Sequence, residues 1–301
     1  MSKQALSWIL LVLLACIWGS SFILMKKGMY SNDGSVIFTS QQVGSLRMLM
    51  AAIALLPISI SKIKILNLKN IVFFAIVGFC GNFFPAYLFT YAETGISSGL
   101  AGMLNSFTPI FTIIIGFLIF KNKLTNKQLF GTFIGTIGIV ALVLTGKNAS
   151  LNGDWEHIFA IVLATLLYAI SLNIIKYKLS SYNSYEITSL AFFSILPFSI
   201  IGFFSTGIIE TIQTNSLAMN GLTYVFILSI VGTALAVLLF NRIIAYSSAL
   251  FASSVTYFIP IVAVMIGFGF GESITIWQVI SMLVILFGVI VANVSVKRTT
   301  E

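Results

Sequence analysis

Long apolar stretches follow one another along almost the whole chain, separated by short polar segments. Each stretch is about 20 residues long, and an α-helix of that length crosses about 30 Å of hydrocarbon. The pattern therefore predicts an all-α integral membrane protein with ten transmembrane helices. The stretches are 5–25, 41–60, 70–91, 97–119, 128–145, 157–175, 186–206, 222–241, 249–269 and 276–296.

The first apolar stretch also resembles a lipoprotein signal. Lys3 precedes an apolar run that reaches Leu13-Leu14-Ala15-Cys16, as at a cleavage site. The run continues to Met25, however, which is long enough to span a bilayer. We expect it to stay in place as the first transmembrane helix.

The composition excludes a soluble protein. Hydrophobic residues make up 58% of the chain and charged residues 8%, against about 45–50% and about 25% in soluble domains. The net charge of +8 is better explained by membrane orientation than by nucleic acid, which we do not expect as a partner. Cys16 and Cys80 lie in apolar runs without metal-ligand spacing, so we expect small buried hydrophobes, no metal and no cofactor.

The two halves of the chain carry matching residues about 150 positions apart. Segment 91–109 aligns without a gap with 242–260. We predict two similar five-helix repeats, residues 1–146 and 147–301, joined at the polar stretch 147–157. Matched positions include Gly81 with Gly232, Phe89 with Phe240, Pro109 with Pro260, and Trp18 with Tyr168.

An odd number of helices per repeat means that the second repeat enters the membrane from the opposite side. The result is an inverted repeat, the construction of many secondary transporters. With the N-terminus inside, twelve Lys and Arg residues fall in inside segments and only Lys26, Lys27 and Lys147 outside. By the positive-inside rule we expect both termini in the cytoplasm. We expect the membrane to be a bacterial inner membrane.

A set of short motifs, weak singly and specific in combination, is spread over the chain. They are Ile17-Trp18-Gly19-Ser20-Ser21-Phe22, the Pro109 and Pro260 helices with their small-residue entrances, Glu272-Ser273-Ile274-Thr275, and Gly131, Gly135, Gly138 and Gly288. By these motifs the chain resembles an EamA-type member of the drug/metabolite transporter superfamily. One departure is that Gly-Glu follows the fourth helix only in the second half, at Gly271-Glu272, whereas the first half has Lys121-Asn122.

The resemblance implies ten helices around a central cavity, alternating access and export of small polar metabolites such as amino acids. Substrate-binding candidates are the polar and aromatic residues on helical stripes, because neutral donors and acceptors suit a cavity that selects a solute. Interhelical hydrogen bonding is the alternative role for these residues. The candidates are Trp18, Ser21, Arg47, Asn82, Tyr87, Tyr91, Asn105, Tyr168, Asn173, Ser254 and Tyr257.

Arg47 is the one basic residue well inside a predicted span. A buried Arg costs several kcal/mol unless it is paired or reaches water. Its guanidinium could bind the carboxylate of an amino-acid-like substrate. Snorkelling to the outer interface and bonding to backbone carbonyls remain open as alternatives.

No Asp or Glu lies centrally in a predicted span, so a buried carboxylate relay for proton coupling is missing. We expect Glu93 to be a solvated charge at a helix end, with movement in and out of the cavity as the alternative, and His157 to have no special role. Pro109 and Pro260 are candidates for hinges or gates, with static kinks as the alternative. Gly131-xxx-Gly135 predicts a close helix contact, within the chain or between subunits, which leaves monomer and homodimer open.

These features favour a secondary transporter of a small polar or amphipathic metabolite over an enzyme. The spans hold no Asp pair and no His-Glu-x-x-His motif, and the chain has no Gly-x4-Gly-Lys-Ser/Thr motif for ATP. Besides the metabolite, membrane lipid is the expected partner. A solute channel and a non-transporting membrane receptor or scaffold remain alternatives.

Overall fold

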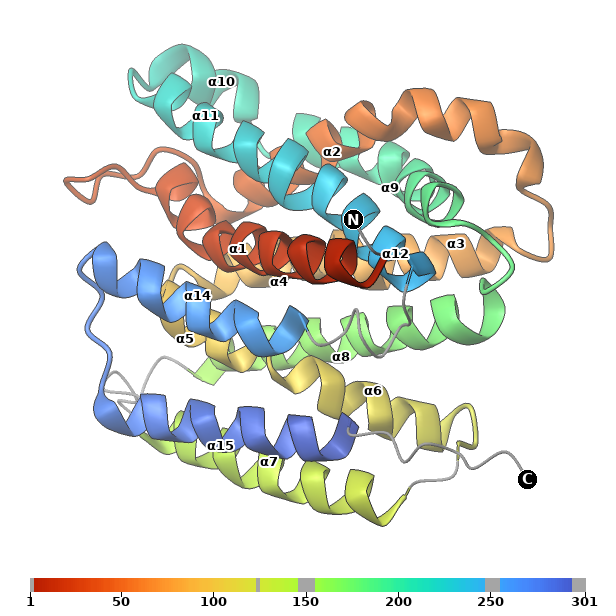
Figure 1. The fold of residues 1–301 in the computed structure, drawn as a ribbon. Coiled ribbons are helices and arrows are strands. Elements are labelled where there is room, and N and C mark those ends of the chain that lie inside the picture. Colours follow the sequence, from red (N-terminus) through yellow and green to blue (C-terminus); the bar gives the residue numbers. More distant parts are fainter. Residues whose placement is uncertain (1–2, 123–124, 146–154, 247–254, 294–301) are drawn as a thin grey trace.

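The protein is a bundle of helices in the computed structural model, which describes residues 3–122, 125–145, 155–246 and 255–293 (Figure 1). These residues contain no strand beyond one isolated bridge between Tyr30 and Val36. The all-helical class predicted from the apolar stretches is therefore confirmed.

The helices of the first part of the chain coincide with the first five apolar stretches. They are α1 (Lys3–Met29), α2 (Ser40–Lys62), the short 3₁₀ turn Ile63–Ile65, α3 (Ile71–Gly78), the π-helical turn η2 (Phe79–Phe83), α4 (Phe84–Ala92), α5 (Ser98–Leu104), α6 (Phe107–Leu118) and α7 (Asn126–Thr145).

The second part follows the same plan. It contains α8 (Trp155–Lys178), α9 (Ser184–Ser205), α10 (Ile208–Thr214), α11 (Ala218–Ser229), the π-helical turn η3 (Ile230–Leu235), α12 (Ala236–Tyr246), α14 (Val255–Gly269) and α15 (Ile276–Asn293). The short α10 is the one of these helices that no apolar stretch predicts; it begins after Gly207, whose φ of +68° is left-handed.

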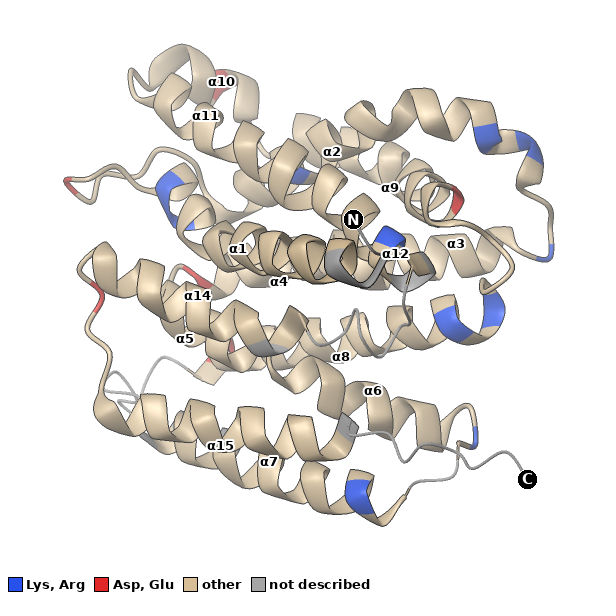
Figure 2. Ribbon diagram, in the orientation of Figure 1, with Lys and Arg blue, Asp and Glu red and all other residues tan. Residues whose placement is uncertain are grey.

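Seven helical stretches among the described residues are long and apolar enough to cross a bilayer, and two shorter apolar helices, Phe258–Gly269 and Ile276–Ala292, accompany them. Charged residues lie mostly toward the helix ends and in loops, while long uncharged stretches lie between them (Figure 2). Large apolar side chains such as Phe133 and Phe287 are exposed on the outer surface, as lipid contact requires. Cys16 is exposed as well, so its expected burial is wrong. The chain is thus a multi-pass membrane protein.

Helices far apart in the sequence pack in pairs, α1 with α14, α2 with α9, α4 with α8, and α7 with α15. The α7–α15 pair runs along one edge of the bundle (Figure 1). A Cβ added to Gly131 would lie 2.3 Å from Ala292 N, and one added to Gly288 would lie 2.3 Å from Gly135 N. The Gly131-xxx-Gly135 motif therefore makes its close contact within the chain.

Two of the predicted spans are interrupted by π-helical turns at matching positions, η2 and η3. Pro85 follows η2 and has no N–H to bond the carbonyl of Gly81, which explains the widened turn there. The position that matches Pro85 after η3 is Ala236 rather than a proline. In both turns a side chain bonds the carbonyl five residues back: Asn82 Nδ2 donates to Val77 O at 3.4 Å, and Thr233 Oγ1 donates to Leu228 O at 2.9 Å.

Candidate functional site

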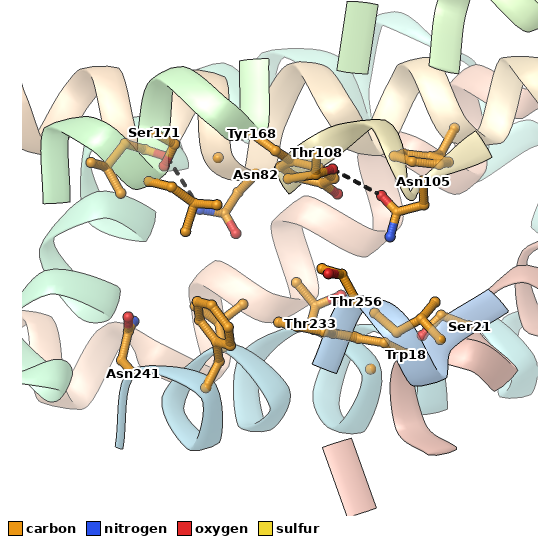
Figure 3. Close-up of a pocket in the computed structure, with 18 of the residues that line it drawn as sticks. Trp18, Ser21, Asn82, Asn105, Thr108, Tyr168, Ser171, Thr233, Asn241 and Thr256 are labelled. Carbon is orange, nitrogen blue, oxygen red and sulfur yellow. Dashed lines mark hydrogen bonds between the residues drawn. The ribbon is translucent and has the colours of Figure 1, made fainter. Parts of the chain in front are cut away.

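A cavity of about 210 Å³ lies between the two parts of the chain. Both parts contribute to its walls. The first part contributes α1, α2, α3, η2, α4 and α6, and the second contributes α8, α9, η3, α12 and α14. In Figure 3, Trp18, Ser21, Thr233, Asn241 and Thr256 lie on one side of the cavity, opposite Asn82, Asn105, Thr108, Tyr168 and Ser171.

Arg47 lies in the cavity wall with 9% of its surface exposed. Its Nε donates to Thr233 Oγ1 at 2.8 Å, and its Nη1 lies 3.6 Å from Met25 Sδ. The guanidinium thus neither snorkels nor bonds a backbone carbonyl among the described residues. No Asp or Glu within the described ranges forms an ion pair with it.

Thr233 positions the guanidinium through the π-helical turn η3. Its hydroxyl donates to Leu228 O and accepts from Arg47 Nε, so both its functions are used. Arg47 lines the cavity, and its Nη1 and Nη2 make no further hydrogen bond among the described residues apart from the weak sulfur contact of Nη1. The fork of donors that they form matches the two oxygens of a carboxylate.

Two aromatic pairs lie on opposite walls of the cavity and follow the sequence repeat. Trp18 of α1 pairs with Phe240 of α12 at 5.2 Å between ring centroids, and Tyr168 of α8 pairs with Phe89 of α4 at 5.9 Å. Trp18 matches Tyr168 in the repeat alignment, and Phe89 matches Phe240. Each pair therefore joins one part of the chain to the other, and all four rings line the cavity.

Neutral amides and hydroxyls complete the polar lining. Asn82 and Asn105 are brought to the cavity as the stripes predict. Sequence reasoning missed Asn241 and Thr188, which join α12 to α9 through a 2.7 Å bond from Asn241 Nδ2 to Thr188 Oγ1. Asn241 is the last residue of the apolar stretch 222–241, whereas Asn82 lies well inside 70–91, so the signal was weaker at Asn241.

Several sequence candidates lie away from the lining. The Tyr87 hydroxyl is 2.9 Å from Ser45 Oγ between α4 and α2. Tyr91 stacks on His157 at 4.9 Å. Asn173 donates to Thr112 O at 3.1 Å and to Ala169 O at 2.9 Å, so it ties α8 to α6.

Two further candidates and the two prolines complete the comparison. Ser254 and the side chain of Tyr257 lie outside the described residues. Pro109 lines the cavity just after the break between α5 and α6, whereas Pro260 lies inside α14 and is not part of the lining. Their role as hinges stays a prediction.

The end of the bundle where α1 and α14 end and α5 begins is here named the α5 end. Glu93 lies there with 1% of its surface exposed, so the expected solvated charge is wrong. Glu272 accepts from the backbone N–H groups of Ser98 at 2.8 Å and Gly99 at 2.9 Å and forms an ion pair with Lys26 at 3.3 Å. Among the described residues no three His, Cys, Asp or Glu gather as a metal site.

Fold and cavity together define a multi-pass helical membrane protein with a polar, Arg-containing chamber between two similar sets of helices. The sequence model of the EamA-like transporter family matches residues 6–144 and, a second time, residues 155–294. The chain belongs to this family of membrane transporters.

Similar proteins carry transporter names. An "Uncharacterized transporter" of Clostridium kluyveri is 23% identical over 86% of this chain and 85% of its own length. A "Probable amino-acid metabolite efflux pump" of Salmonella typhimurium is 28% identical over 50% of this chain, and one of Escherichia coli is 26% identical over 58%. The alignments span 44% and 55% of those two pumps, about half of their lengths.

One crystal structure of a protein superimposes on this chain with a TM-score of 0.60. The superposition covers 99% of this chain and 100% of the other, at 12% sequence identity. At that identity the likeness shows the fold alone.

Proposed function

We propose that the protein is a secondary transporter that exports small amino-acid-like metabolites through the cavity by alternating access. The observation that carries the proposal is Arg47, a guanidinium in the cavity wall without an acidic partner among the described residues. A buried cation in a membrane protein is costly unless it is compensated. A substrate carboxylate supplies that compensation.

The remaining lining favours an amphipathic solute. Two aromatic pairs flank the chamber, and Asn82, Asn105 and Asn241 offer amide donors and acceptors. The efflux-pump names of the two enterobacterial relatives agree with this substrate class.

The proposed architecture is ten transmembrane helices in two inverted repeats, 1–146 and 147–301. The repeated family match and the paired π-helical turns support it. Rocking of one repeat against the other then opens the cavity to each side in turn. With the Lys- and Arg-rich segments inside, both termini lie in the cytoplasm of a bacterial inner membrane and the α5 end faces outward.

The test is transport by the purified protein in liposomes loaded with mixed amino acids and related metabolites, with and without a pH gradient. Saturable, solute-specific efflux supports the carrier. Arg47→Gln abolishes transport of carboxylate-bearing solutes, because the glutamine amide has no charge to offset the carboxylate. Arg242→Gln is the matched control, since Arg242 is exposed and bonded to Tyr246; it leaves transport unchanged.

Two outcomes would contradict the proposal. Non-saturable flux of the same solutes would indicate a channel, and no flux from folded protein would indicate a receptor or scaffold. Unchanged transport by Arg47→Gln would refute the role of the guanidinium while leaving the carrier in place.

A further inference from the structure

The α5 end of the cavity holds a buried carboxyl group that the proposed substrate site does not use. Glu93 follows the last residue of α4, just outside the candidate span Ile71–Ala92. Its Oε2 accepts from Ser98 Oγ at 2.9 Å, whereas its Oε1 is buried without a hydrogen-bond partner among the described residues. An ionised carboxylate in this position would have a hydrogen-bond donor at only one of its two oxygens.

Ser98 connects Glu93 to the ion pair that joins the two parts of the chain. Its hydroxyl bonds Glu93, while its backbone N–H and that of Gly99 bond Glu272. Lys26, at the end of α1, pairs with Glu272 and lies 3.5 Å from Ile96 O. A single serine thus touches both carboxyl groups.

This cluster lies directly beyond the cavity. Met25 and Phe89 line the cavity, and Lys26 is the residue after Met25, while Glu93 is about one helical turn beyond Phe89. The residues that match Lys26 and Glu272 in the repeat alignment are Lys176 and the neutral Asn122, whose amide bonds Tyr177. The ion pair of the α5 end is therefore not repeated at those positions.

The charges within the cluster balance only when one carboxyl group carries a proton. Lys26 and ionised Glu272 neutralise each other, so an ionised Glu93 would add one uncompensated negative charge in a buried, water-excluded environment. Other titratable groups at this helix end are Tyr91 of α4 and, on α8, His157 and Glu156. His157 contacts Thr94 at 3.2 Å, and Glu156 interacts with Tyr91. Burial raises the pKa of Glu93 from 4.5 to about 8, against the opposing attraction of Lys26.

We propose that Glu93 is a proton-binding site whose occupied form holds the α5 end of the cavity closed. Binding forms one O–H bond on the carboxylate and leaves a neutral acid, with no other group changed. Opening of the α5 end separates Ser98 and Lys26 from their partners and hydrates Glu93, which then releases its proton to the side that this end faces. Proton binding and opening exclude each other. The link to transport rests on the proposed function, whereas proton binding itself does not.

The difference in proton affinity between the closed and open forms sets how strongly the open-to-closed ratio depends on pH. The closed form binds the proton with the raised pKa and the open form with a pKa near the ordinary 4.5. Between these two values the open-to-closed ratio rises with pH by up to about tenfold per unit, because one proton is released on opening. Above the raised pKa the ratio levels off.

Infrared difference spectroscopy of the full-length protein in lipid nanodiscs measures the proton directly. We expect a carboxylic-acid C=O band that disappears as the pH rises through about 8 and is absent from Glu93→Gln. Glu210→Gln is the matched control, because Glu210 is an exposed acid of α10; it keeps the band. Ser98→Ala removes the donor to the ionised form, so the band should titrate at a higher pH.

Opening is measured by maleimide labelling of Ile96→Cys in a background without Cys16 and Cys80. Its labelling rate is divided by that of the exposed Ser35→Cys, which corrects for the pH dependence of the thiol reaction. We expect this ratio to rise up to about tenfold per pH unit and then level off, and to stay low and flat with Glu93→Gln. An unchanged band in Glu93→Gln, or an equal pH slope, would overturn the proposal. A titrating band in protein that transports nothing would overturn the proposed function alone.

Discussion

Substitution of Gly288 by alanine tests the close contact between α7 and α15. The added Cβ would lie 2.3 Å from Gly135 N, 2.7 Å from Gly131 O and 2.7 Å from Gly135 Cα. All three are backbone atoms, so no rotamer change can relieve the overlap. Carbon atoms pack at about 3.5 Å or more, and α7 and α15 must therefore separate by about 1 Å.

Overpacking of this kind costs about 1–3 kcal/mol. About 1.4 kcal/mol is a factor of ten in an equilibrium constant, so Gly288→Ala should lower the equilibrium constant for folding by a measurable factor. Gly269→Ala is the matched control: Gly269 ends α14, and a Cβ added there would have no atom within 4 Å. We expect that control to change stability by less than about 0.5 kcal/mol.

The assay is reversible unfolding in mixed micelles with increasing sodium dodecyl sulfate, followed by tryptophan fluorescence. The double variant Gly131→Ala with Gly288→Ala should cost less than the two single costs together, since helices already separated have room for the second methyl group. Wild-type stability of Gly288→Ala would refute the reasoning. A cost that changes on dilution of the protein would place the contact between subunits instead.

Two other substitutions probe the cavity wall and a strained turn. Thr233→Val removes the acceptor of Arg47 Nε. It should raise the KM for efflux of a carboxylate-bearing solute about fivefold, the effect of losing about 1 kcal/mol of binding free energy. An unchanged KM would show that Thr233 does not position the guanidinium. Lys121 follows α6 with a left-handed φ of 55°, and its counterpart in the other repeat is Gly271. Lys121→Gly should therefore stabilise the protein by about 0.5–1 kcal/mol in the same unfolding assay. Destabilisation would show that the Lys121 side chain contributes more than the strain costs.

The helices could be predicted from the sequence because the bilayer fixes their length and hydropathy. Their internal irregularities could not. The π-helical turns change hydrogen bonding without changing hydropathy, and the break at Asn105 and Ser106 falls inside one apolar stretch. The helix α10 is too short and too polar to stand out from a loop.

The site could be predicted only in part, for a related reason. Helical stripes identify a polar face, and Trp18, Asn82 and Tyr168 do line the cavity. Tyr87 and Asn173 have the same signature, but their hydroxyl and amide bond neighbouring helices. The burial of Glu93 escaped prediction because it is a property of the tertiary structure: at this helix end Glu93 bonds Ser98, and the fold brings Lys26 and Glu272 there from distant parts of the chain.

The two π-helical turns also bear on the ancestry of the chain. A π-helical turn is one residue inserted into an α-helix, and here the insertions stand at matching places, Phe79–Phe83 and Ile230–Leu235. Two separate insertions at one site would need a coincidence. A single insertion in an ancestor of the two segments that match the family model, 6–144 and 155–294, copied when its gene was duplicated and fused, needs none. Pro85 and its counterpart Ala236 then show that the turn does not require the proline. Homologues without a proline at either position should still carry both turns.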